Sequence, residues 1–145
     1  REGALVTIAT DGPCSNNDLD MWEEMRTAVL LQKSATGDPC AMPAEEVLRM
    51  VTVNGVRALG WGDELGVIRE GALADVILID LQKPHFQPVH RLAADLVYCG
   101  KAADVETVVV DGEIVVENRR VLHTDLARLF RDAEAAVRRI TACRG

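Results

Sequence analysis

The chain has 145 residues, of which 48% are apolar, and this is enough for one ordinary domain whose hydrophobic core needs no metal or disulfide staples. The formal net charge of -7 argues against a nucleic-acid partner, because phosphate binding depends on clustered Lys and Arg. No apolar run approaches the roughly 20 residues that cross a bilayer, and the start at Arg1 and Glu2 lacks the charged-then-apolar pattern of a signal segment, so we expect a cytoplasmic location.

The first expected element is a strand at residues 4–9, a run of Ala, Leu, Val, Thr and Ile near the start of the sequence. A lone apolar strand needs neighbours on both edges. Together with the lack of an initiator Met, this pattern indicates a piece cut from a larger sheet or barrel. A loop of small, polar and turn-forming residues follows at 10–17.

Two helices are expected next. Residues 18–36 carry an apolar stripe at helical spacing, with Asn17 as a plausible N-cap and Gly37 as a terminator. Pro43 can begin the second helix, and a short continuation follows a cap at Thr52.

The second half of the chain is predicted to be mainly β structure with a closing helix. Residues 73–79 are typical of a buried strand, and 92–98 of a short helix. Val-rich runs at 107–110 and 113–116, joined by Asp-Gly, predict a tight hairpin. A last helix is capped by Thr124, and its apolar face comprises Leu126, Leu129, Phe130, Ala133, Val137 and Ile140.

The cysteines and histidines give no sign of a metal site. No Cys-x-x-Cys pair occurs, and free thiols are therefore expected at Cys14, Cys40, Cys99 and Cys143. His85 and His90 lie in a proline-containing loop and His123 stands alone, so we expect surface residues rather than ligands.

Asp11 is the best candidate for chemistry. It follows the apolar run 4–9 after Thr10, and it precedes Gly12 and a polar loop. In parallel α/β barrels, a carboxylate at the end of a strand points into the catalytic face. Thr-Asp-Gly is also an ordinary turn sequence, however, so the residues alone leave both interpretations open.

Longer runs of sequence resemble a known family. Residues 9–12, 15–21 and 24–26 resemble the last barrel strand, loop and helix of the amidohydrolases, in the branch of methylthioadenosine and S-adenosylhomocysteine deaminases and triazine chlorohydrolases. Residues 52–60 and 66–75 resemble the family's next helix and its return into a small β domain. Residues 108–112 resemble the hairpin of that domain.

The resemblance implies a fold class and a domain organisation. The chain would be the C-terminal part of a metal-dependent (β/α)₈ barrel, with part of a small composite β-sandwich and a C-terminal helix. Residues 1–62 would end the barrel domain, 63–123 would belong to the β-sandwich and 124–145 would form the helix. The N-terminal barrel portion would be a partner, and a homo-oligomer is expected.

The resemblance also implies a site. One divalent metal, zinc or iron, would be held mostly by histidines that have no counterpart here, with Asp11 as both a metal ligand and the proton shuttle. Ser15, Asn16 and Asn17 would either orient Asp11 or cap the next helix. We expect the chain by itself to bind no metal and to be inactive.

The implied reaction is hydrolysis of a C–N or C–Cl bond in a nitrogen heterocycle, such as deamination of an adenosine-like small molecule. The alternative is a non-catalytic α/β module that acts by association. The fragment hypothesis requires exposed apolar surface on residues 4–9 and on the first helix, and it predicts aggregation or self-pairing. A genuine module would be monodisperse.

Overall fold

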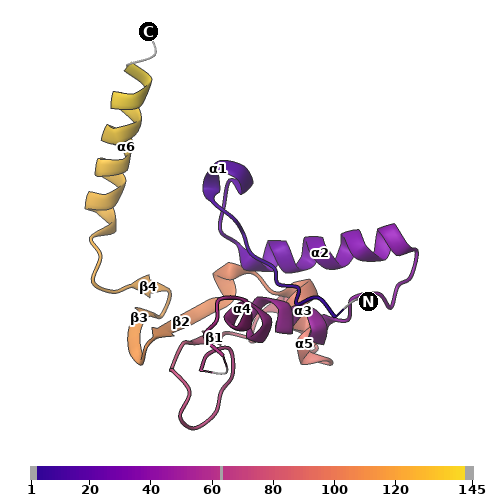
Figure 1. Cartoon of the computed structure of the whole chain (residues 1–145). Coiled ribbons are helices and arrows are strands. Elements are labelled where there is room, and N and C mark those ends of the chain that lie inside the picture. The colour runs from indigo at the N-terminus through magenta and orange to yellow at the C-terminus, as the bar shows by residue number, and fades with distance from the viewer. Residues whose placement is uncertain (1–2, 63, 143–145) are drawn as a thin grey trace.

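The protein combines a small helical core, a four-stranded antiparallel sheet and a separate C-terminal helix (Figure 1). The computed structural model describes residues 3–62 and 64–142. In chain order the helices and strands are α1 (Pro13–Asn16), α2 (Met21–Thr36), α3 (Ala44–Val51), α4 (Val53–Ala58), β1 (Val76–Ile79), η1 (Pro84–Phe86), α5 (Leu92–Cys99), η2 (Ala102–Asp104), β2 (Val105–Val110), β3 (Glu113–Glu117), β4 (Arg120–Val121) and α6 (Leu126–Ala142).

Helix α2 begins three residues later than the predicted helix. Its N-cap is Asp20, whose side chain accepts a hydrogen bond from the backbone N–H of Trp22 at 2.8 Å. The predicted cap at Asn17 is wrong, because this residue has a positive φ of 70° and ends the short helix α1 instead. Gly37 terminates α2 in the left-handed conformation, as predicted.

The hydrophobic core lies between α2, α3 and α5, which pack on one another. Val29 of α2, Val47 of α3 and Val97 of α5 are fully buried. The helix predicted from Pro43 is confirmed, since Pro43 is the N-cap of α3. Complete burial of one Val from each helix fixes α2 firmly against the other two.

The sheet has the strand order β1-β2-β3-β4, with every pair antiparallel. The predicted hairpin is confirmed as β2 and β3, which are joined at Asp111 and Gly112. Both turn residues have positive φ, 50° and 80°. These backbone angles give the turn a twist that matches the twist of the two paired strands. Strand β1 is shorter than the run expected from the sequence, and β4 was not expected.

Residues 4–9 do not form the predicted strand. They run in extended conformation past α3 and α4, where the Thr7 hydroxyl and the Ile8 N–H both donate to the carbonyl of Met50. The side-chain amide of Asn54 donates to the carbonyl of Val6 at 2.8 Å. A strand requires a neighbour to pair with, and none lies beside this segment among the residues that the structure describes.

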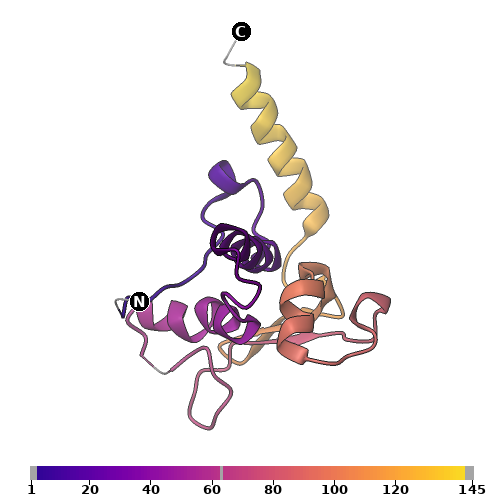
Figure 2. The ribbon, with the colours of Figure 1, turned by 90° about the vertical axis from the view of Figure 1, so that its right-hand side faces the viewer.

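Helix α6 stands apart from the rest of the molecule, as Figure 2 shows most clearly. Its predicted apolar face forms but is not covered: Phe130 is 61% exposed and Ile140 is 63% exposed. The predicted cap at Thr124 is wrong, because the side chain of Asp125 accepts the N–H of Arg128 at 2.9 Å. No helix in the described part of the chain is long and apolar enough to cross a membrane.

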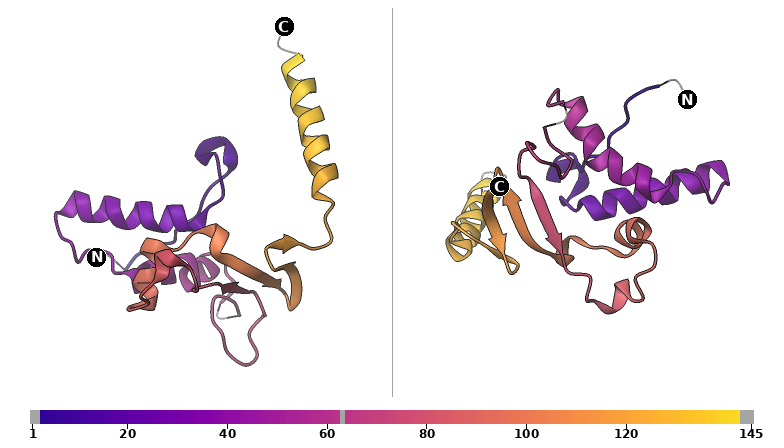
Figure 3. Two further views of the ribbon diagram at one scale, coloured as in Figure 1. Left: turned by 180° about the vertical axis from the view of Figure 1, so that it is seen from behind. Right: turned by 90° about the horizontal axis from the view of Figure 1, so that it is seen from below.

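The sheet and the helical core are adjacent units (Figure 3). The domain boundaries expected at residues 62, 63 and 124 remain predictions, since no observation tests them. Arg1, Glu2 and Cys143 lie outside the described residues, as does Asp63 at the start of the second predicted segment. Within the described residues, Cys14, Cys40 and Cys99 are free thiols.

Candidate functional site

Asp11 lies where the extended N-terminal segment turns into α1. Its backbone has a positive φ of 56°, which a residue other than glycine adopts only under local constraint. Its Oδ1 accepts the backbone N–H of Gly12 at 2.7 Å, and its Oδ2 accepts the hydroxyl of Ser15 at 2.9 Å. The carboxylate is exposed, so its orientation is set by these two hydrogen bonds and not by packing against other side chains.

The same two hydrogen bonds set the charge of Asp11. The Ser15 hydroxyl, and after it the Gly12 N–H, hold the pKa of the Asp11 carboxyl below its ordinary value, because both stabilise the ionised form. Slight desolvation opposes them. The group is therefore an anion over the whole neutral range and is available as a proton acceptor or a metal ligand.

The three residues predicted to orient Asp11 or to cap the next helix have different positions. Ser15 contacts Asp11 directly, while Asn17 is the C-cap of α1 and donates its N–H to the carbonyl of Pro13. The side-chain amide of Asn16 donates to Oε1 of Glu24 on α2 at 2.7 Å. None of the three caps α2, and Glu24 is a contributor that sequence reasoning missed.

A metal would need more ligands than Asp11 provides. Among residues 3–62 and 64–142, no group of three His, Cys, Asp or Glu side chains is placed to hold an ion. The described residues by themselves therefore do not fit a complete metal site.

His85 is exposed, as expected, and its ring is paired with a buried carboxylate. Its Nε2 lies 2.9 Å from Oδ2 of Asp104, a carboxylate that is only 3% exposed as a residue. The same oxygen accepts the backbone N–H of Lys101 at 3.0 Å. This pair joins η1 to η2 and has a structural role.

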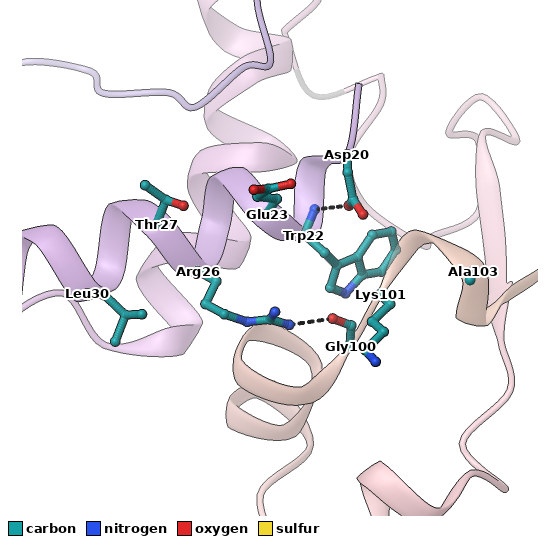
Figure 4. A pocket seen from close by; sticks show the side chains of 9 residues that line it. All are labelled: Asp20, Trp22, Glu23, Arg26, Thr27, Leu30, Gly100, Lys101 and Ala103. Atoms are coloured by element: carbon teal, nitrogen blue, oxygen red, sulfur yellow. Dashed lines mark hydrogen bonds between the residues drawn. The ribbon is translucent and has the colours of Figure 1, made fainter. Parts of the chain in front are cut away.

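A hollow lies between the start of α2 and the turn after α5 (Figure 4). The guanidinium of Arg26 donates to the carbonyl of Gly100 at 2.6 Å, and the indole of Trp22 lies against Gly100. The Nε1 of Trp22 and the Nε of Arg26 are buried, and neither has a hydrogen-bond partner among the described residues. The link from Arg26 to Gly100 spans 74 residues of sequence, so no local pattern could have predicted it.

Comparison with known proteins gives consistent results. The model of the amidohydrolase family matches residues 1–115. A 5-methylthioadenosine/S-adenosylhomocysteine deaminase from Desulforudis audaxviator is 51% identical over 138 residues, which are 95% of this chain and 32% of that protein. A 5'-deoxyadenosine deaminase from Methanosarcina acetivorans is 45% identical over 97% of this chain and 32% of its own length.

Solved structures show the same similarity. The crystal structure of an adenosine deaminase from Xanthomonas campestris with bound zinc superposes with a TM-score of 0.92 at 37% identity, over 96% of this chain and 32% of that one. The zinc-containing atrazine chlorohydrolase TrzN from Arthrobacter aurescens gives a TM-score of 0.76 at 32% identity, over 86% of this chain and 28% of that one. The chain thus spans about a third of the length of these relatives.

Proposed function

The chain belongs to the amidohydrolase family, and from that membership we propose that it is part of a metal-dependent hydrolase that acts on C–N or C–Cl bonds of nitrogen heterocycles. The predicted fold class, the C-terminal part of the barrel enzyme with part of its small β domain, is confirmed by these matches. Deamination of an adenosine-like substrate is the preferred reaction, because the similar proteins named above include three deaminases of adenosine or its derivatives.

The observation that carries the proposal is the geometry of Asp11. An ionised, exposed carboxylate, oriented by Gly12 and Ser15 at the end of an extended segment, is suited to accept a proton from an attacking water. It then returns that proton to the leaving amine, so that water replaces the amino group and ammonia departs. A divalent metal, zinc or iron, would lower the pKa of the water when bound.

Further parts of the proposal concern the assembled protein. The remaining metal ligands come from the N-terminal barrel portion, with which this chain forms one site. The complete protein binds a small-molecule heterocycle, forms a homo-oligomer and works in the cytoplasm.

The exposed apolar surface favours the hydrolase fragment over a non-catalytic module. Leu5 and Val6 on the extended segment are 51% and 50% exposed, and Leu30 and Leu31 on α2 are 53% and 65% exposed. These are the two regions where the fragment hypothesis requires missing neighbours. A free-standing module would keep such large aliphatic side chains covered.

The test is activity of the complete protein that contains this chain, on a panel of adenosine-like and chlorotriazine substrates. Asp11→Asn should lower kcat by about 100-fold or more, because general acid–base groups contribute roughly 10²–10⁴-fold. Asp18→Asn is the matched control: Asp18 is exposed, and its Oδ1 accepts the N–H of Asp20, which an amide oxygen can also do. Absence of hydrolysis by the unmodified protein, or full activity of the Asp11 variant, would refute the proposal.

A further inference from the structure

The position of Asp11 depends on a segment that is weakly attached to the rest of the protein. Both groups that bind its carboxylate, the Gly12 N–H and the Ser15 hydroxyl, belong to α1 or to the residue before it. Helix α1 has four residues, and none of them is buried. Packing alone therefore does not hold the carboxylate in place, and the location of Asp11 follows the location of α1.

One side-chain hydrogen bond ties α1 to the helical core. In the described part of the chain, the side chain of Asn16 at the end of α1 donates to Oε1 of Glu24 at 2.7 Å. Both side chains are part-buried, and the acceptor is a carboxylate, which makes this a strong class of hydrogen bond. Ser15 is the immediate neighbour of Asn16, so the tie lies one residue from the group that orients Asp11.

Glu24 is attached to a rigid element. It lies on α2 next to Met25, which is 3% exposed, and five residues before the fully buried Val29. Helix α2 is capped at one end by Asp20 and at the other by Gly37. The backbone that carries Glu24 is therefore held in place, and a residue that positions another group needs such a rigid attachment.

We infer that Glu24 is a positioning residue for Asp11. It holds Asn16, Asn16 fixes α1, and α1 presents Ser15 and the Gly12 N–H to the carboxylate. Glu24 itself does not touch the reacting atoms. The inference rests on the proposed function only in the role that it gives to Asp11, since the mechanical link can be measured without activity.

The first experiment measures amide hydrogen exchange in the complete protein by mass spectrometry. The N–H groups of Ser15 and Asn16 donate to the carbonyl of Gly12, and that of Asn17 donates to Pro13, so their exchange reports opening of α1. Glu24→Ala should speed exchange in the peptide that covers 12–17 by about ten-fold, the effect of losing one hydrogen bond, and leave the peptide covering α3 unchanged.

Matched variants separate positioning from general destabilisation. Glu24→Gln keeps an acceptor oxygen for Asn16 and should restore slow exchange. Glu23→Ala changes the exposed neighbour on the same turn and should have no effect. Asn16→Ala should reproduce the Glu24→Ala result, and the double variant should be no worse than either single variant, because both remove the same hydrogen bond.

The second readout is the kinetics of the complete enzyme. Glu24→Ala should lower kcat by about ten-fold with KM changed less than two-fold, since a misplaced catalytic group affects the transition state more than binding. Unchanged exchange in Glu24→Ala, or additive effects of the two single variants, would overturn the inference. An inactive unmodified protein whose exchange still responds to Glu24→Ala would refute the proposed function and leave the mechanical link standing.

Discussion

Replacing Gly100 by Ala tests the packing between α2 and the end of α5. A β-carbon at Gly100 would lie 2.4 Å from Nε1 and 2.7 Å from Cδ1 of Trp22, and 2.5 Å from the carbonyl oxygen of Leu96. The backbone there has φ -62°, which Ala adopts freely, so the cost is steric. Overpacking costs about 1–3 kcal/mol, and we expect about 2–3 kcal/mol here because one of the opposing atoms is backbone.

Urea denaturation followed by tryptophan fluorescence and circular dichroism gives the free energy of unfolding. Gly12→Ala is the control, since Gly12 has φ -92° and its added β-carbon would meet only Cys14 Sγ at 3.8 Å. It should change stability by less than about 0.5 kcal/mol. Combining Gly100→Ala with Trp22→Leu should recover about 1 kcal/mol of the loss, because part of the clash is with the indole. A Gly100→Ala protein that loses less than about 0.5 kcal/mol of stability would refute the reasoning.

Three other substitutions have defined outcomes. Ser15→Ala should raise the pKa of Asp11, measured by carbon-13 NMR titration, because the Ser15 hydroxyl stabilises the ionised carboxylate. Since the pKa of Asp11 is lower in the folded state, this hydrogen bond stabilises the protein above the unfolded pKa, and the stabilisation is lost as the pH falls through the folded pKa. Asp104→Ala should cost about 1–3 kcal/mol in urea, because it removes the buried oxygen that accepts both the ring N–H of His85 and the backbone N–H of Lys101. Gly112→Ala should cost about 1 kcal/mol by thermal unfolding, because its φ is +80°.

The elements that sequence reasoning predicted well are those with local causes. The β2–β3 hairpin follows from Asp111 and Gly112, and the end of α2 follows from Gly37, since in each case one or two residues adopt the left-handed conformation. The start of α2 was misplaced because Asn17 and Asp20 are equally good caps by composition. Only the fold of α1, which uses Asn17 as its own C-cap, decides between them.

In the candidate site, too, the features with local causes could be predicted and those that depend on the fold could not. The hydrogen bonds of Asp11 reach one and four residues along the chain, so a turn with a following Ser could be anticipated. The bond from Asn16 to Glu24 depends on how two helices meet. Residues 4–9 form no strand, because no strand pairs with them in the described part of the chain. The pairing of His85 with Asp104 likewise required the fold of the segment between them.

The order of the strands has a consequence for the kinetics of folding. Strands β2, β3 and β4 pair with their immediate neighbours in sequence through short turns, whereas β1 reaches β2 only after the segment that contains α5. Hairpins with tight turns form in about 1–10 μs, and closure of longer loops delays the pairing of distant strands. We therefore expect β2–β4 to form early and β1 to join as the core around Val97 packs. Substitutions at Gly112 should then slow folding, while substitutions at Val97 should mainly speed unfolding.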